Sequence, residues 1–156
     1  MNVRLIEREP AHVVYLRHVG PYGEPISRFW QDVVYPWMVT NDLVGRPRYG
    51  VSHDDPSITT SRNLRYDACV EVPRDFHGVG NHHETTIPGG RYAVSSFKGT
   101  AREINDAWAA LLRDWLPSSN MQLDARPFLE YYATDMSFDP ATGVFESDLC
   151  VPVAKL

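Results

Sequence analysis

The segment that decides the fold reads ISRFWQDVVYPW, from Ile26 to Trp37. Its apolar side chains recur at steps of four, three, one and three residues, which is the spacing of one face of an α-helix. The same spacing returns 78 residues later in INDAWAALLRDW, from Ile104 to Trp115. Two helical stripes with identical spacing indicate an internal repeat.

The residues around the two stripes repeat as well. A strand-like segment that ends in glycine precedes each stripe. Further along, Arg46-Pro47 returns as Arg126-Pro127, and Asp67-Ala68-Cys69-Val70 returns as Asp148-Leu149-Cys150-Val151. Each copy therefore reads as strand, helix, strand, strand. The copies cover residues 1–73 and 82–156, with 74–81 as the connection.

These patterns predict an α+β fold made of a tandem duplicated βαββ unit with pseudo-two-fold symmetry. The predicted helices cover residues 24–43 and 100–116. The predicted strands cover residues 2–19, 45–54, 65–72, 82–98, 126–133 and 144–153. Proline at position 36 is expected to end or kink the first helix. A capping box formed by Thr100 and Glu103 is expected to begin the second.

Composition excludes several classes of function. The chain has 156 residues, 43% of them hydrophobic, and a net charge of −5 without any run of Lys or Arg, so direct nucleic-acid binding is not expected. No segment is apolar for long enough to span a membrane. The six histidines form no metal motif, and the glycines form no nucleotide loop. We therefore expect no metal and no cofactor. We expect a cytoplasmic protein in which Cys69 and Cys150 are reduced.

Glu130 is the first candidate site residue. It lies among Phe128, Leu129, Tyr131 and Tyr132, so it cannot be a routine solvated charge on both faces of its strand. A carboxylate in an apolar groove offers a counter-charge for a cation or a carboxyl with a raised pKa. The alternative is a glutamate on an edge strand that faces water.

Several further motifs lie before and after the two helices. They are His18-Val19-Gly20-Pro21-Tyr22, Leu64-Arg65-Tyr66-Asp67-Ala68-Cys69, Gly89-Gly90-Arg91-Tyr92, Phe97-Lys98-Gly99-Thr100, Asp114-Trp115-Leu116-Pro117 and Glu130-Tyr131-Tyr132. With these motifs the chain resembles the GyrI-like family, also described as the effector-binding domain of AraC-type regulators. The resemblance implies one curved antiparallel sheet, two main helices on one side of it, and a concave ligand groove between the two halves.

The resemblance also implies site residues. Glu130 matches the glutamate that contacts the ligand in similar proteins. Tyr66 and Phe145 would stand at the groove wall, where ordinary cross-strand packing is the alternative. Trp108 and Ile104 would reach the groove end, whereas the other tryptophans of the stripes are expected in the core. Gly50 is the counterpart of Glu130 in the first copy and would leave space for a ligand.

Three functions fit these residues. The first is binding of lipophilic, aromatic or cationic small molecules, for sensing or for resistance to a toxic compound. The second is hydrolysis of reactive cyclopropane-type compounds, with Glu130 as the catalytic residue and a tyrosine as its partner. The third is a protein-binding module similar to a gyrase inhibitor. A transcription regulator or gyrase is the protein partner that the resemblance suggests, and the oligomeric state stays open. The sequence also leaves open which face of the sheet Tyr15 and Phe97 occupy.

Overall fold

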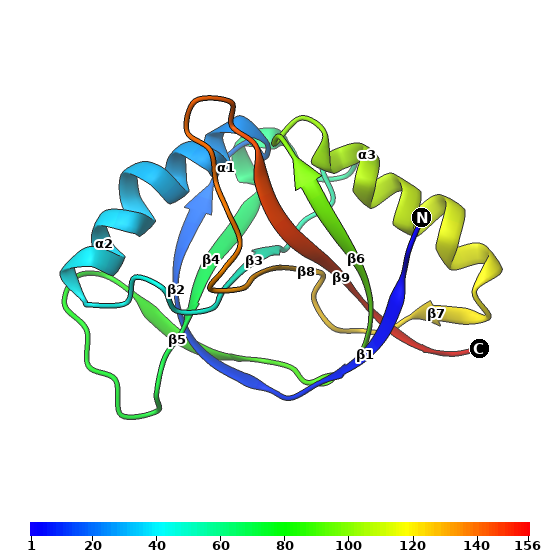
Figure 1. The fold of residues 1–156 in the computed structure, drawn as a ribbon, viewed down its shortest axis with the longest axis horizontal. Helices are drawn as coiled ribbons and strands as arrows, with labels where there is room; N and C mark the ends of the chain where they lie inside the picture. The colour runs from blue at the N-terminus through cyan, green and yellow to red at the C-terminus, as the bar shows by residue number, and fades with distance from the viewer.

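The computed structural model describes residues 1–156 and shows one curled antiparallel sheet (Figure 1). Its strands, in spatial order, are β1 (Arg4–Arg8), β6 (Gly90–Gly99), β9 (Phe145–Lys155), β8 (Leu129–Tyr132), β3 (Arg48–Ser52), β4 (Arg65–Glu71), β2 (Ala11–Val19) and β5 (His83–Ile87). A short strand, β7 (Met121–Leu123), pairs with the end of β9 and was not predicted. The two copies meet in the middle of the sheet, where β3 pairs with β8. The predicted fold class is confirmed.

Each half of the sheet carries one helical segment (Figure 1). The first comprises α1 (Glu24–Phe29), η1 (Trp30–Val34) and α2 (Tyr35–Thr40). The second comprises α3 (Ile104–Ala109), η3 (Ala110–Trp115) and the single 3₁₀ turn η4 (Leu116–Ser118). None of the helices is long and apolar enough to cross a membrane.

A widened helical turn precedes a proline in both copies. The N–H of Tyr35 donates to the carbonyl of Trp30, five residues earlier, directly before Pro36. The N–H of Leu116 does the same with Leu111, directly before Pro117. Proline removes one helical hydrogen bond and its ring displaces the carbonyl four residues back, and a wider turn accommodates both effects. The first helix therefore continues through Pro36 to Thr40 instead of ending there.

The first strand of each copy pairs with the other copy. Strand β1 pairs with β6 of the second copy, and β5 pairs with β2 of the first. The predicted strands 2–19 and 82–98 are each interrupted, at Glu9-Pro10 and at Pro88-Gly89. The interruption bends the chain so that each leading segment crosses to the neighbouring half. The exchange ties the two copies together and was not predicted.

Three clusters of buried side chains hold the molecule together. One cluster lies under α1, η1 and α2, and a second lies under α3 and η3. The third fills the face of the sheet that carries no helix and draws on both copies, including Cys69 and Cys150. The two halves therefore share one core. Both cysteines are free and buried, as predicted, and burial raises the pKa of the Cys150 thiol to about 12.

The predicted capping box forms only in part. The carboxylate of Glu103 accepts hydrogen bonds from the backbone N–H and the hydroxyl of Thr100, at 2.9 and 3.1 Å. The hydroxyl of Thr100 is thereby directed to Glu103 and makes no bond to the N–H groups of the first turn. Regular α-helix accordingly begins at Ile104, four residues later than predicted.

Candidate ligand-binding site

Glu130 lies at the centre of the sheet, on the face that carries the helices. It stands on β8 directly opposite Gly50 of β3. Its neighbours Leu129 and Tyr131 pack into the cluster on the helix-free face. Because side chains alternate along a strand, Glu130 and Tyr132 face the two helical segments. Glu130 is thus half-buried between the copies, not on an outer edge strand.

Three donors from three elements converge on the Glu130 carboxylate. The hydroxyl of Tyr132 donates to Oε1 at 2.9 Å, and the hydroxyl of Tyr66, from β4, reaches the same oxygen at 3.4 Å. The indole N–H of Trp108, from α3, lies 3.4 Å from Oε2. Trp30, from the other helical segment, donates to the Tyr66 hydroxyl at 2.9 Å. Both copies therefore contribute to the surroundings of one carboxylate.

Burial dominates the electrostatics of this group. It raises the pKa of Glu130 above its ordinary value, although the hydrogen bonds from Tyr132, Trp108 and Tyr66 act in the opposite direction. Burial also raises the pKa values of Tyr66 and Tyr132 well above 10, so both phenols stay protonated and remain donors. Glu130 forms no ion pair with any Lys, Arg or His of the chain. Only neutral donors reach its carboxylate oxygens.

Aromatic rings enclose the carboxylate on both sides. On the first side Trp30 packs edge-on against Tyr132, with ring centroids 5.6 Å apart. On the second side Trp108 stacks on Phe128 at 5.8 Å and an interplanar angle of 19°. Phe145 closes the row at 6.3 Å from Tyr132. All of these rings are half-buried and keep part of their surface exposed, whereas the ring of Tyr66 is buried.

The sequence-derived site residues come together in part. Glu130, Tyr66 and Trp108 share hydrogen bonds, and Phe145 lies one ring away. Ile104 is a core residue, 8% exposed, in the cluster beneath α3. Phe97 lies in the same cluster and packs on Phe145 at 5.5 Å.

Two details differ from the expectation. Tyr66 is 2% exposed and presents its hydroxyl, not a ring face, toward Glu130. The space above Gly50 does not stand open for a ligand, because a Cβ there would lie 2.0 Å from the Tyr66 hydroxyl. The glycine instead admits the end of the tyrosine side chain.

Sequence reasoning missed Tyr132, Trp30 and Arg48. Period-two alternation from Glu130 would have placed Tyr132 on the same face. Trp30 was expected in the core, and it does pack there, but its N–H also reaches the hydroxyl beside Glu130. Arg48 is directly opposite Tyr132 in the ladder between β3 and β8, a pairing that a single strand does not reveal.

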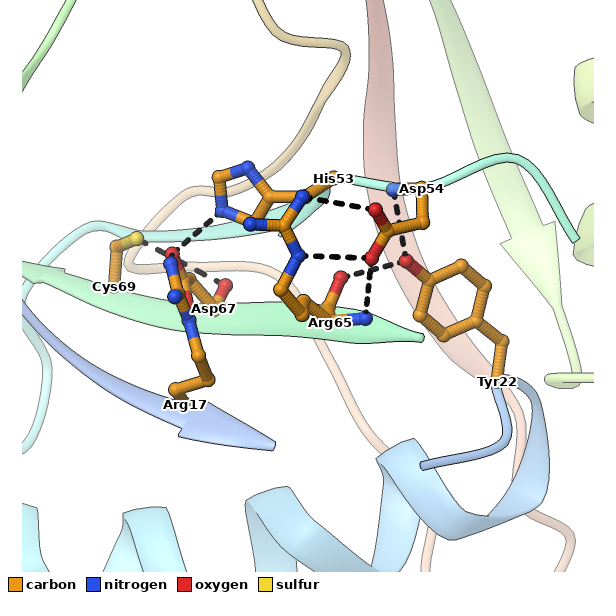
Figure 2. A network of polar contacts seen from close by, with 7 residues as sticks. All are labelled: Arg17, Tyr22, His53, Asp54, Arg65, Asp67 and Cys69. Carbon is orange, nitrogen blue, oxygen red and sulfur yellow. Dashed lines mark hydrogen bonds and ion pairs between the residues drawn. The ribbon is translucent and has the colours of Figure 1, made fainter. Parts of the chain in front are cut away.

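A second polar network lies on the opposite face of the sheet (Figure 2). Asp67, next to Tyr66 on β4, is 5% exposed and accepts two hydrogen bonds from Arg17 at 2.7 and 2.9 Å and one contact of 2.6 Å from His53. Burial alone would raise the pKa of Asp67, but the bonds from Arg17 and His53 outweigh it and the pKa is lowered. This network joins β2, β4 and the residue that follows β3, at the end of the sheet where the Tyr22 hydroxyl donates to the backbone carbonyl of Arg65.

Two cavities also lie away from Glu130. One, of about 150 Å³, borders Tyr15, Asp67 and Leu129 on the helix-free face. Tyr15 therefore lies on the face of the sheet that carries no helix. The other, of about 320 Å³, borders Arg8 and Tyr131. Glu130 lines neither of them. No group of three or more His, Cys, Asp or Glu residues is placed to hold a metal ion.

Nearly the whole chain matches a protein family. The sequence model of the family described as "GyrI-like small molecule binding domain" matches residues 1–154. The chain belongs to this family. A DNA gyrase inhibitor of Erwinia billingiae is 28% identical to it over 158 residues, and the alignment covers 99% of each chain.

Two solved structures share the fold of this chain. The C-terminal domain of EcmrR superimposes with a TM-score of 0.76 at 16% identity, covering 99% of this chain and 98% of that domain. SAV2435 bound to tetraphenylphosphonium superimposes with a TM-score of 0.62 at 16% identity, covering 99% of this chain and 94% of SAV2435. At these identities the likeness concerns the fold alone.

Proposed function

We propose that this GyrI-like domain binds lipophilic aromatic cations between its two copies, with Glu130 as the counter-charge. The observation that carries the proposal is a half-buried carboxylate that has aromatic rings on both sides and no cationic partner within the chain. A buried carboxylate without a cation is costly, and a cationic ligand would relieve that cost. SAV2435, which shares the fold, is bound to a cation of this class.

The rings supply the remainder of the binding energy. A cation that contacts an aromatic face gains about 0.5–2 kcal/mol, and a stacked ring pair gains about 0.5–1.5 kcal/mol beyond the burial of its area. A ligand at Glu130 would lie against the half-buried rings of Trp108, Tyr132 or Phe145. Binding should therefore change the fluorescence of Trp108 and Trp30.

Titration with tetraphenylphosphonium tests the proposal. We expect tryptophan fluorescence and calorimetry to detect binding to the unaltered protein, and Glu130→Gln to weaken it about 10–100-fold. This is the effect of removing a charged partner worth roughly 1.5–3 kcal/mol. Glu84→Gln is the matched control, because Glu84 is an exposed glutamate on β5. Equal affinity of Glu130→Gln and Glu84→Gln would contradict a counter-charge at Glu130.

Hydrolysis is the second candidate function, favoured by one observation. Glu130 has a raised pKa and lies 2.9 Å from the Tyr132 hydroxyl, an arrangement suited to proton transfer with a reacting water. Incubation with an electrophilic cyclopropane compound, followed by mass spectrometry, would detect a product enlarged by one water. Turnover that Glu130→Gln abolishes would favour hydrolysis, and an unchanged compound would favour binding alone.

The cellular role that we propose is sensing of a toxic compound or resistance to it, in the cytoplasm. Two free, buried cysteines fit a reducing compartment. In either role the ligand would bind at Glu130, and only the consequence of binding would differ.

A further inference from the structure

Arg48 places a positive charge beside the Glu130 site. It lies on β3 opposite Tyr132, and its side chain shares the helix-bearing face with Gly50, two residues along. Its guanidinium carbon lies 5.5 Å from the centroid of the Tyr132 ring and 6.0 Å from that of Trp30. These rings are the ones that enclose Glu130 on the side of the first copy.

Arg48 has no anionic partner in the chain. It forms no ion pair and donates no hydrogen bond to another residue, although a guanidinium carries five donors. Burial accordingly lowers its pKa, with only the two nearby phenols acting in the opposite direction. The Arg48 side chain is half-buried, and its nitrogen atoms are not fully enclosed, because the only fully enclosed side-chain polar atom without a partner is Nε2 of His12. A half-buried arginine with unused donors is an anion-binding group.

Glu130 does not neutralise Arg48, although both face the helices. The two residues are diagonal neighbours across β3 and β8, a relationship that separates their Cα atoms by about 7–8 Å. Tyr132 stands between them, since its ring contacts Arg48 and its hydroxyl binds Glu130. The site therefore keeps a negative and a positive group apart on one wall.

The two copies of the repeat differ in the residue that meets the tryptophan of their helix. An offset of 80 residues relates Arg48 to Phe128, as it relates Gly50 to Glu130. Trp30 and Trp108 are equivalent in the same way, at an offset of 78. Trp108 stacks on Phe128, whereas Trp30 meets the guanidinium of Arg48. One end of the site is thus apolar and the other end is cationic.

We infer that the natural ligand is an aromatic zwitterion, whose ammonium faces Glu130 while its carboxylate or other oxyanion binds Arg48. This inference rests on the proposed function, because it assumes that the ligand occupies the Glu130 site. It narrows the ligand class from lipophilic cations in general to flat ring systems that carry both charges. Arg48 is then the residue that determines specificity.

Two dyes that differ in one charge test the inference. Rhodamine B carries a cationic ring system and a free carboxylate, and its ethyl ester carries the cation alone. We expect the unaltered protein to bind rhodamine B about tenfold more tightly than the ester, as measured by fluorescence polarisation. Arg48→Gln should abolish that preference: rhodamine B should bind less tightly, and the ester, which no longer meets a second positive charge beside the site, should bind at least as tightly as before. Arg48→Lys, which retains the charge, should keep part of the preference.

The outcomes separate this inference from the proposed function. The role of Arg48 is overturned if the two dyes bind equally, if the ester binds more tightly, or if the preference survives Arg48→Gln. It is also overturned if the protein binds tetraphenylphosphonium but neither dye. The proposed function stands in those cases if Glu130→Gln still weakens cation binding. Failure of all three compounds to bind, or affinities that do not depend on Glu130, overturns both. If Arg48→Gln does not fold, Arg48→Met replaces it, because methionine packs on the same rings without charge.

Discussion

Substitution of Gly50 by alanine tests whether the Tyr66 hydroxyl fills the space opposite Glu130. The added methyl carbon would lie 2.0 Å from the hydroxyl oxygen of Tyr66, 2.8 Å from its Cζ and 3.0 Å from Oε1 of Glu130. Tyr66 is 2% exposed and its hydroxyl accepts a hydrogen bond from Trp30, so the ring has little freedom to withdraw.

The expected cost follows from these contacts. Overpacking of a buried site costs about 1–3 kcal/mol, and each hydrogen bond lost from the Tyr66 hydroxyl adds about 0.5–1.5 kcal/mol. We expect Gly50→Ala to lower the free energy of unfolding by about 2–4 kcal/mol. For a chain of this length, that corresponds to a fall in Tm of roughly 5–15 °C. Urea unfolding followed by tryptophan fluorescence measures the change.

A double-mutant cycle shows whether the clash is with Tyr66. Tyr66→Phe removes the atom that the methyl group would overlap, so Gly50→Ala should cost about 1–2 kcal/mol less in that background. Tyr92→Phe is the control, because the Tyr92 hydroxyl binds Pro88 and its ring lies in the cluster on the opposite face. Gly50→Ala with wild-type stability, or equal costs in the Tyr66→Phe and Tyr92→Phe backgrounds, would refute the reasoning.

Two further predictions concern the helix-free face. Asp67→Asn should cost about 1.5–3 kcal/mol at neutral pH, because it removes the charge of a buried carboxylate that accepts two hydrogen bonds from the partly exposed Arg17. The pKa of Asp67 is lowered by folding, so the charge stabilises the native state above the ordinary carboxyl pKa, and the difference between Asp67→Asn and wild type should fade in urea unfolding as the pH falls through the lowered value. Cys69 and Cys150 should resist a thiol reagent in the native state, since both are buried with raised pKa values, and both should react once guanidinium unfolds the chain. Rapid labelling of either native thiol, monitored by absorbance, would argue against the shared core.

The sequence predicted the elements that depend on local pattern. The helical stripes around Trp30 and Trp108 and the positions of the six main strands follow from spacing that each segment carries within itself. The exchange of β1 and β5 between the copies does not. Which strand pairs with which is decided by contacts across the whole chain, and Pro10 and Pro88 mark only where the chain bends.

The same division applies to the site. The enclosed position of Glu130 on the sheet was predictable, because an acidic residue interrupts an apolar strand. Its hydrogen bonds to Tyr132 and Trp108 depend on the register between β8 and β3 and on the angle of α3, which the sequence does not state. The space beside Gly50 was expected to hold a ligand, but it holds the hydroxyl of Tyr66. The sequence does not reveal this contact, because Tyr66 comes from a different strand, β4.

The duplication explains where the two copies were free to diverge. Positions that pack helix on sheet, such as Trp30 and Trp108, remain the same in both copies because each half needs the same apolar stripe. Positions on the central strands that face between the helices have changed, to Gly50 and Arg48 in the first copy and to Glu130 and Phe128 in the second. A symmetric groove would bind a symmetric molecule in two equivalent orientations. The opposite charges of Arg48 and Glu130 remove that equivalence, so the orientation of a bound ligand should be fixed by its own charges.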